Sequence, residues 1–430
     1  MPIKILATAD LHLGRKSSAV PSVADESSTK HTWNNMVDRA IEQGVHVLLL
    51  SGDIIDQDNK YYEAIGPIQS GFDKLNKNGI AVYLVTGNHD FDVLAEIIRS
   101  NKYENIHLLG AGGNWEKKTY KSDEGMLQVA GWSFPNKYVT ENPMIKFSEL
   151  ELDPNVVTVG LLHGEVDALE SKYAPVSLSE LKFAGPEAWI LGHIHKPVEF
   201  SSEAPYIAYP GSPHALDPGE TGAHGPVLLE VYGKNDIKVE RIPLSPIRYE
   251  NITVAVETGD DESAVRDAMT STLLQEGQKL LPELANVAFL VYDIVLEGTH
   301  TEVKELDDWI DPVVQNYEQK LETGTQITVR KVENNVQPAV ENLEELAENP
   351  SPAGKLAETI LAIQQGRTTP FLNKLTDEWK GKIQKLNKAG TYSPLKQDGR
   401  LPEFDEQMAR KAILQECNQL LNKLINQQQT

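Results

Sequence analysis

Histidine, aspartate and asparagine side chains follow five short apolar segments within the first 200 residues of the chain. These segments lead into Asp10-Leu11-His12, Gly52-Asp53, Gly87-Asn88-His89-Asp90, His163-Gly164 and Gly192-His193-Ile194-His195. Imidazole, carboxylate and amide groups without thiolate are ligands that suit manganese, iron and zinc. The pattern therefore predicts a metal centre built from residues that lie far apart in the sequence.

The number of potential ligands is enough for two metal ions, provided that one carboxylate bridges them. The candidate ligands are Asp10, His12, Asp53, Asn88, His163, His193 and His195. Two metals roughly 3.5–4 Å apart can clamp the attacking and leaving oxygens of an in-line displacement. A water between them loses a proton near neutral pH, because the metal charge lowers its pKa. The expected chemistry is hydrolysis by a hydroxide bound to two metals.

The apolar segments are predicted to be buried strands. Val45–Leu50, Ile80–Val85 and Val156–Leu162 are short and mostly aliphatic, as expected for strands covered on both faces. In open α/β sheets, ligands bind beyond the carboxyl ends of the strands. Period-two alternation would point Asp10 and His12 in the same direction, with the residue between them toward the core. The same argument applies to the pair of histidines that follows the last strand.

Each motif taken alone has an ordinary structural explanation. A D-x-H segment occurs often by chance, and a single histidine such as His163 is usually a core or surface residue. Five such segments in order, each at a strand end, favour the metal site. The remaining histidines lack this context and are predicted to be structural or solvated: His31, His46, His107, His214, His224 and His300.

Strands and helices alternate early in the chain, and from Trp115 onward strands dominate as far as Pro243 and Pro246. We therefore expect stacked sheets with helices outside them rather than a simple doubly wound sheet. Residues 247–338 are predicted to form a small β-α-β-α-β unit, in which Thr299–Glu302 fits a capping box before the second helix. Residues 339–430 are predicted to be mostly helical.

Composition narrows the protein class. The chain has 430 residues, a formal net charge of −23 and one cysteine, which suits two or three domains and excludes a disulfide framework or a multi-cysteine zinc site. No apolar run reaches the ~18 residues of a membrane span, and the N-terminus is unlike a signal peptide, so we expect a cytoplasmic protein with no membrane segment. The acidic balance argues against tight, unassisted binding to a phosphate backbone.

The motifs DLHLG, GDIID, GNHD, LHG and GHIH, which begin at Asp10, Gly52, Gly87, Leu162 and Gly192, resemble those of the calcineurin-like metallophosphoesterases. Within that superfamily the sequence is similar to the SbcD-type DNA double-strand-break repair nucleases. The segment Tyr209-Pro210-Gly211-Ser212-Pro213 and a small cap after the phosphoesterase domain are also typical of that subgroup. The superfamily resemblance covers about residues 1–245, and the subgroup resemblance extends to about residue 335.

The resemblance implies an α/β fold with a four-layer α-β-β-α catalytic sandwich over residues 1–246, a small α/β cap over 247–338 and a helical C-terminal region over 339–430. It also implies two divalent metal ions, with manganese as the expected metal and Asp53 as the bridge. One metal would be held by Asp10, His12, Asp53 and His195, and the other by Asp53, Asn88, His163 and His193. The non-ligand His89 would protonate the leaving oxygen or stabilise the transition state, and Asp90 would orient it.

The implied activity is that of a manganese-dependent phosphodiesterase acting on DNA, with 3′-to-5′ exonuclease and single-strand endonuclease activity. The alternative is a phosphoesterase for small phosphodiesters or phosphoproteins that uses the same metals. Family members pair with an SbcC-type coiled-coil ATPase and are commonly dimers. The chain has no G-x-x-x-x-G-K-[ST] phosphate loop, so an ATP-driven step requires such a partner.

Three further features leave alternatives open. Near the C-terminus, Leu414, Cys417, Leu421 and Leu424 are spaced as one apolar helix face, which either docks the ATPase or packs within the tail itself. The lysines between Lys380 and Lys388 are a solvated helix face or a nucleic-acid contact. The polar loop Arg15–Lys30 either shapes the substrate path or is idle surface, and Arg15 itself is a phosphate contact or a solvated residue.

Overall fold

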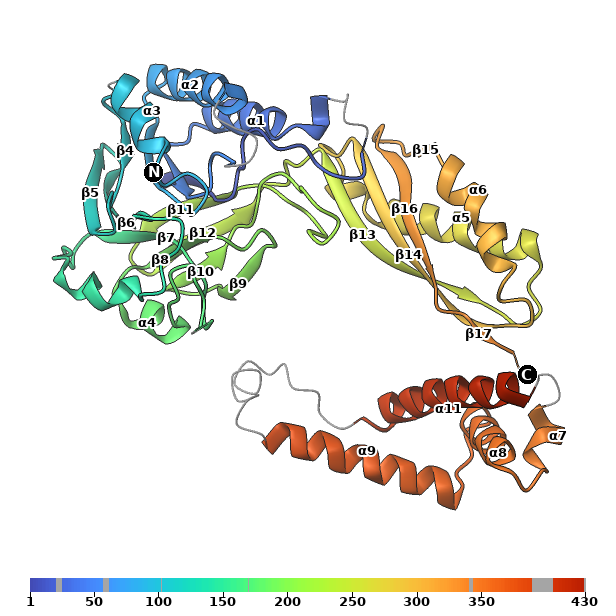
Figure 1. Cartoon of the computed structure of the whole chain (residues 1–430). Coiled ribbons are helices and arrows are strands. Elements are labelled where there is room, and N and C mark those ends of the chain that lie inside the picture. The colour runs from blue at the N-terminus through green and yellow to red at the C-terminus, as the bar shows by residue number, and fades with distance from the viewer. Residues whose placement is uncertain are drawn as a thin grey trace. The chain divides into compact units, whose positions relative to one another are not determined.

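The computed structural model describes residues 1–20, 25–56, 62–101, 103–168, 170–339, 343–388 and 405–428 (Figure 1). Its contacts divide the chain into two compact units. Unit 1 comprises Met1–Ile252, Ser271–Ile294 and Val314–Lys331, and unit 2 comprises Thr253–Thr270, Val295–Val313 and Val332–Thr430. No helix in the described ranges is both long and apolar enough to span a bilayer. The domain boundaries expected after residues 246 and 338 stay a prediction.

The first sheet of unit 1 has six strands in the order β12-β11-β1-β2-β3-β4. Strands β1 to β4 are parallel, and β11 joins β1 in the antiparallel sense. Parallel pairing brings the carboxyl ends of β1, β2 and β3 to one edge. The strands are β1 (Ile3–Thr8), β2 (Val47–Ser51), β3 (Ala81–Val85), β4 (Ile106–Leu108), β11 (Val227–Gly233) and β12 (Asp236–Arg241).

The second sheet also has six strands, in the order β5-β6-β7-β8-β10-β9. Its central strands β6, β7, β8 and β10 are parallel, and β5 and β9 are antiparallel edges. The strands are β5 (Trp115–Ser122), β6 (Gly125–Trp132), β7 (Val157–His163), β8 (Ala188–Gly192), β9 (Val198–Ser201) and β10 (Tyr206–Tyr209). The mixed α/β fold with several sheets that the sequence indicated is therefore confirmed.

The two sheets share one apolar core, and helices cover their other faces. Ile5 and Leu49 of the first sheet lie in one buried cluster with Val129, Leu161 and Ile190 of the second. Because strand side chains alternate, the intervening residues of the first sheet face α1 (Thr29–Glu42), α2 (Tyr62–Lys77) and α3 (Leu94–Asn101). On the second sheet, the other face packs on the short α4 (Leu178–Phe183) and on a 3₁₀ segment, η2 (Pro143–Glu149).

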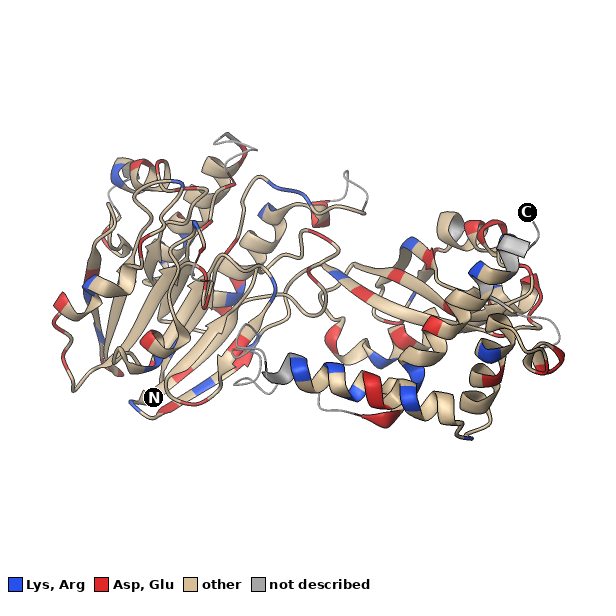
Figure 2. Cartoon of the chain, turned by 60° about the horizontal axis from the view of Figure 1, so that its bottom comes forward, with Lys and Arg blue, Asp and Glu red and all other residues tan. Residues whose placement is uncertain are grey.

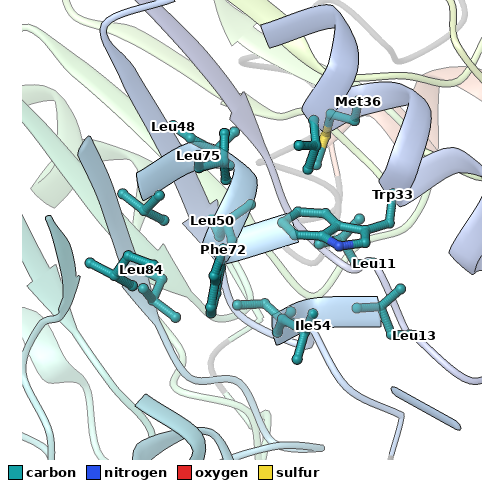
Figure 3. Close-up of a cluster of buried hydrophobic side chains, with 14 of the residues drawn as sticks. Leu11, Leu13, Trp33, Met36, Leu48, Leu50, Ile54, Phe72, Leu75 and Leu84 are labelled. Atoms are coloured by element: carbon teal, nitrogen blue, oxygen red, sulfur yellow. The ribbon is translucent and has the colours of Figure 1, made fainter. Parts of the chain in front are cut away.

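Trp33 organises the helices over the first sheet (Figure 3). Its indole N–H donates a 2.9 Å hydrogen bond to the carbonyl of Pro67 in α2, and its ring packs edge-to-face on Phe72. A Cβ at Gly71 would lie 2.4 Å from the Trp33 ring, so α1 and α2 approach closely only with glycine there. The same cluster buries Leu11, which separates Asp10 from His12, so packing of the helices also fixes the first motif.

The third sheet has the order β13-β14-β16-β15, with β17 paired to β14. Its elements are β13 (Ile247–Val256), α5 (Glu262–Lys279), the 3₁₀ turn η3 (Leu281–Glu283), β14 (Phe289–His300), α6 (Leu306–Asn316), β15 (Gln319–Lys320), β16 (Gln326–Asn334) and β17 (Gln337–Pro338). The capping box predicted at Thr299–Glu302 is wrong, because β14 extends to His300 and α6 begins only at Leu306. A capping box does form elsewhere, where Ser177 and Glu180 start α4.

Helices α7 (Leu343–Ala347), α8 (Pro352–Gln364), α9 (Pro370–Lys388) and α11 (Glu406–Gln428) follow in unit 2. A buried cluster includes Ile360 of α8, Leu372 of α9 and, from α11, Cys417 and Leu421. Leu414 packs partly buried against the same cluster, as does Leu424. The apolar face recognised in the sequence therefore packs against the tail's own helices.

His214 ties the polar loop after β1 to the turn that precedes β11. Its Nε2 lies 2.8 Å from the hydroxyl of Ser17, and its Nδ1 lies 2.7 Å from the hydroxyl of Thr32. The hydroxyl of Ser17 also donates to the carbonyl of Ala215. The loop is thus bonded into unit 1 on both sides of residues 21–24, which lie outside the described residues.

The burial of His214 predicts an acid-sensitive contribution to stability. Burial lowers the pKa of His214 from 6.5 to about 4, so the unfolded chain takes up this proton first as the pH falls. The contribution is complete above about pH 6.5 and is lost as the pH falls to about 4, with a total of about 3 kcal/mol in the free energy of unfolding. Urea denaturation of the wild type and of His214→Gln at several pH values measures the effect. We expect a smaller acid-induced loss in the variant, and parallel curves would contradict the assignment.

Candidate metal centre

The carboxyl ends of five strands, three from the first sheet and two from the second, supply the candidate ligands. Asp10 and His12 follow β1, Asp53 follows β2 and Asn88 follows β3; His163 ends β7, and His193 and His195 follow β8. Asp10, His12, Asp53, Asn88 and His163 are at most 5% exposed, whereas the last two histidines are half-buried. Both sheets must therefore be in place before these side chains meet.

The carboxylate of Asp53 lies at the centre of the group. Its Oδ2 is 3.3 Å from Nε2 of His163, 3.9 Å from Nε2 of His12 and 4.0 Å from Nε2 of His89. Its Oδ1 accepts a 2.9 Å hydrogen bond from the backbone N–H of His89. One oxygen thus faces three imidazoles, which is the position that a bridging ligand requires.

The remaining candidates surround Asp53 on two sides. On one side, Nε2 of His12 lies 3.0 Å from Nε2 of His195, and Asp10 completes a group whose ligand atoms lie within 4.8 Å of one another. On the other side, Asp53, His163 and His193 form a second such group. The Oδ1 of Asn88 lies 3.1 Å from Nε2 of His163. The structure therefore brings all seven candidate ligands to one place, as two neighbouring clusters.

Hydrogen bonds to the outer ring nitrogens orient three of the histidines. Nδ1 of His163 lies 3.0 Å from the carbonyl of Ser51, Nδ1 of His195 lies 2.8 Å from Glu220, and Nδ1 of His12 lies 3.2 Å from Asp56. A neutral ring that donates a hydrogen bond from Nδ1–H to each of these oxygens presents an unprotonated Nε2 to the centre. This is the tautomer that binds a metal, so the donor set fits two divalent ions.

His193 has the opposite orientation. Its Nε2 lies 3.1 Å from Glu165, which leaves Nδ1 as the atom available to a metal. Its backbone N–H donates to both oxygens of Asp10 at 3.0 and 3.1 Å. Burial, together with the charge of His163, lowers the pKa of His193, which favours the neutral, ligating form of the ring.

Four of the candidate ligands have left-handed backbone conformations. The φ angles are 53° at Asp10, 43° at His12, 49° at Asp53 and 102° at His193. Such angles are uncommon outside glycine and cluster at functional sites. The expectation that strand alternation pairs Asp10 with His12 is therefore wrong in its cause, because β1 ends at Thr8 and tight turns beyond the strand make the pairing.

Two glycines allow the close approach of these turns. A Cβ at Gly87 would lie 2.1 Å from Oδ1 of Asp53, and a Cβ at Gly192 would lie 2.0 Å from the carbonyl oxygen of Ser51. Both distances are far below van der Waals contact with backbone or ligand atoms. The sequence placed glycine beside these motifs, and the structure shows that neither position has room for a side chain.

Charges around Asp53 keep it ionised although it is buried. Burial alone would raise its pKa, but His163, His12 and His89 outweigh that effect and hold the pKa of Asp53 well below its usual range. The hydrogen bond that His89 donates to the carboxylate of Asp56 raises the pKa of His89 against the effect of burial. A carboxylate that stays charged at 2% exposure requires nearby positive charge, which imidazolium groups or cations supply.

The carboxylate of Asp90 does not contact the ring of His89 among the hydrogen bonds of the described residues. Its oxygens accept instead from the backbone N–H groups of Gly87 at 2.8 Å and Ile54 at 2.7 Å. Asp90 therefore joins the loops after β2 and β3. The carboxylate beside His89 is that of Asp56, whose Oδ1 lies 3.5 Å from Nδ1 of His89.

Sequence reasoning missed three acidic residues that orient the histidines: Asp56, Glu165 and Glu220. Asp56 is the last residue of the GDIID motif, and Glu165 directly follows the LHG motif. Their positions in or beside a motif could therefore have identified them from the sequence. Glu220 lies 25 residues after His195, in a segment with no recognisable pattern, and only the fold brings it there.

His89 forms a third metal-ligand group with His12 and Asp56. The histidines that the sequence left unassigned take no part in the groups found among the described residues: His31, His46, His107, His214, His224 and His300. His46, for example, receives the backbone N–H of Lys4, and His224 bonds to the carbonyl of Ser212. Arg15 forms an ion pair with Asp217 at 3.1 Å. The tail lysines Lys380 and Lys382 belong to α9, whereas Lys396 and Arg400 lie outside the described residues.

Comparison with known proteins places these residues in a family context. Residues 3–197 match the profile described as calcineurin-like phosphoesterase. An uncharacterized metallophosphoesterase of Bacillus subtilis, YhaO, is 27% identical over 308 residues, which cover 70% of this chain and 73% of that protein. The DNA double-strand break repair protein Mre11 of Nanoarchaeum equitans is 26% identical over 152 residues, which cover 30% of this chain and 40% of that protein.

Among solved structures, a dimetal phosphatase from Danio rerio aligns over 56% of this chain and 99% of its own, with 11% identity and a TM-score of 0.36. That score is too low to support an inference about activity. The profile match over residues 3–197 includes all seven candidate ligands.

Replacing Glu220 is expected to weaken metal binding. Glu220→Gln keeps the size of the side chain but removes the charge that receives Nδ1–H of His195. Loss of such an orienting carboxylate typically costs about 10- to 100-fold in metal affinity. Calorimetric titration with Mn²⁺ should show one weakened site and one unchanged site.

The matched control is Glu187→Gln, because the carboxylate of Glu187 also receives a backbone N–H, that of Thr158, but lies outside the centre. We expect this variant to bind Mn²⁺ as the wild type does. Equal affinity in both variants would show that Glu220 does not orient a ligand.

Proposed function

We propose that the chain, which belongs to the calcineurin-like phosphoesterase family through residues 3–197, is a manganese-dependent DNA nuclease that acts in double-strand-break repair. The observation that carries the proposal is the convergence of seven nitrogen and oxygen ligands from five strand ends on one carboxylate, that of Asp53. In this proposal the two sheets form a four-layer α-β-β-α sandwich, and the third sheet with α5 and α6 forms the cap.

The ligand set divides into two metal positions that share Asp53. Asp10, His12 and His195 would hold one ion, and Asn88, His163 and His193 would hold the other. When bound, two divalent ions supply an activated water and neutralise the developing charge on a phosphoryl group. Bonds at Nδ1 keep Nε2 of His12, His163 and His195 in place. The bond from Nε2 of His193 to Glu165 does the same for its Nδ1, so the ligands would need little reorganisation during turnover.

His89 is placed to handle a proton. Its side chain is 30% exposed and its Nε2 lies 4.0 Å from Oδ2 of Asp53, so it borders the ligands without being enclosed by them. The pKa of His89 is raised, first by the carboxylate of Asp56, which favours the protonated ring. A protonated imidazole at this edge can donate to the leaving oxygen or stabilise the charged transition state.

The preference for DNA is supported by the likeness to Mre11 over 152 residues and by the segment Tyr209–Pro213. The hydroxyl of Tyr209 donates to the carbonyl of Gly164, and the backbone N–H of Ser212 donates to the carbonyl of His195. This segment therefore holds two ligand-bearing turns. Charges of both signs are interspersed over the described chain (Figure 2), so a net charge of −23 does not make every face repel phosphate.

A phosphoesterase for small phosphodiesters or phosphoproteins is the second candidate, because the same ligands serve either substrate. A Mn²⁺-supplemented assay on labelled linear and hairpin DNA, beside bis-p-nitrophenyl phosphate, separates the two. We expect cleavage of DNA from the 3′ end and within single strands. Turnover of the small ester alone would reject the nuclease and retain the second candidate.

His89→Ser is expected to lower kcat by about 10²- to 10⁴-fold, since it removes the proton donor. Because His89 is not among the proposed ligands, the affinity for Mn²⁺ should stay within a few-fold of the wild type. Steady-state kinetics and calorimetry measure the two quantities. His107→Ser is the control, since His107 lies on β4 beside Tyr83. A wild-type rate in His89→Ser would remove His89 from the mechanism.

We also propose that unit 2 docks an SbcC-type coiled-coil ATPase. The face containing Cys417 packs within the tail, and Cys417 also borders a groove of about 560 Å³ that lies between α9 and α11. Apolar side chains of Leu375, Trp379 and Leu420 line it, and Leu420 is 47% exposed. An amphipathic helix fits such a groove by its apolar face.

Leu420→Glu should weaken copurification with a candidate ATPase of this type at least tenfold, because it places a charge in the groove. Met408→Glu is the matched control, since Met408 is also exposed on α11 but does not line the groove. A binding assay with purified partners measures the difference. Equal binding of both variants would exclude this groove as the docking surface.

A further inference from the structure

A row of aromatic rings extends from the candidate metal centre to the surface of unit 1. The ring of Tyr173 lies 4.5 Å from the ring of His193, centroid to centroid, with 33° between their planes. The ring of Tyr138 lies 5.9 Å from that of Tyr173, and Tyr138 is 53% exposed. Neighbouring π surfaces thus join a candidate ligand to the solvent.

Two lysine ammonium groups flank the outermost ring. Nζ of Lys137 lies 5.9 Å from the ring centroid of Tyr138, and Nζ of Lys172 lies 5.8 Å from it. The negative face of the ring attracts both cations and keeps them beside it. Cations next to a stacking surface are the combination by which proteins bind single-stranded nucleic acid, with phosphates on the cations and bases on the rings.

Backbone hydrogen bonds hold the row in place. The N–H of Val139 donates to the carbonyl of Lys172 at 2.8 Å, and the N–H of Ala174 donates to the carbonyl of Val139 at 2.8 Å. The N–H of Glu165, beside the ligand-bearing end of β7, donates to the carbonyl of Tyr173 at 3.0 Å. The segments that carry both tyrosines are therefore fixed to each other and to the centre. Little conformational entropy is then lost when a ligand binds.

We propose that Tyr138, Tyr173, Lys137 and Lys172 form a subsite that stacks an unpaired base of the strand being cut and contacts its phosphates. The proposal rests on the proposed nuclease function and names which part of the substrate is held beside the metal ligands. A base within a duplex is already stacked on both faces and is not available to the tyrosine rings. A phosphate ester without a base has no ring that could stack on them. The subsite therefore selects a single-stranded or frayed nucleotide.

The first test compares two single-stranded oligonucleotides with the wild-type protein and Mn²⁺. One is unmodified, and the other carries tetrahydrofuran abasic residues in its last four nucleotides. The abasic strand cannot stack on the tyrosine rings, so we expect its KM to be about tenfold higher than that of the unmodified strand. This comparison needs no variant and therefore does not depend on the folding of one.

Variants then test whether the difference in KM between the two strands comes from the row of aromatic rings. In Tyr138→Ala, the KM of the unmodified strand should rise about tenfold and the ratio between the two strands should approach one. Tyr138→Phe keeps the ring and should keep the ratio. Tyr232→Ala is the matched control, because Tyr232 is 50% exposed and has Nζ of Lys238 5.1 Å from its ring, but lies on β11 outside the row.

Lys137 and Lys172 are tested by salt dependence. The double variant Lys137→Gln/Lys172→Gln should lower the slope of log binding constant against log salt by about 1.4, since each single-strand phosphate contact contributes about 0.7. Fluorescence anisotropy of a labelled single strand in EDTA measures this binding. An unchanged slope would remove the two lysines from the proposal.

The outcomes separate this subsite from the nuclease function. Equal wild-type KM values for both strands, or a Tyr138→Ala variant that behaves as Tyr232→Ala does, would overturn the subsite while DNA cleavage remains. Failure of the wild type to cleave any DNA, with bis-p-nitrophenyl phosphate still hydrolysed, would overturn both proposals.

Discussion

The ionised, buried carboxylate of Asp53 is the constraint on which the rest of the candidate centre depends. A charge at 2% exposure is costly unless positive groups surround it, and here three imidazoles face one of its oxygens. The other oxygen receives the backbone N–H of His89, which fixes the loop after β3. Gly87 lacks a side chain because a Cβ there would collide with this carboxylate. Backbone shape, residue choice and electrostatics around the centre thus follow from one group.

The sequence predicted the strands and the candidate ligands where residues close in the sequence determine them. Apolar segments located β2, β3 and β7 to within two residues at each end, and the family motifs named ligands that the fold brings together. It did not predict contacts between residues that only the tertiary fold brings together. Glu220 reaches His195 only because the chain returns past the end of β8, and no local pattern encodes that approach. The capping box at Thr299 failed because pairing within the sheet kept those residues in β14, a tertiary effect that overrides the local preference.

The left-handed turns at the candidate ligands show how function modifies a regular fold. Strand alternation would have been the simplest way to aim Asp10 and His12 at one point, but both residues lie past the end of β1. Backbone hydrogen bonds from Asp10 to Gly52 and from His12 to Asp53 hold the turn against its strain. The buried Leu11 anchors it from the other side. The helices over the first sheet therefore support the geometry of the centre as well as the stability of unit 1.

The candidate ligands extend from Asp10 to His195. Nearly half of the chain must therefore be synthesised before both clusters can form. Early intermediates in synthesis have Asp10, His12 and Asp53 but lack the second sheet's histidines. Such a nascent chain has only part of the proposed ligand set. Metal binding at the proposed centre would therefore follow the synthesis of β8, and it would then join the two sheets.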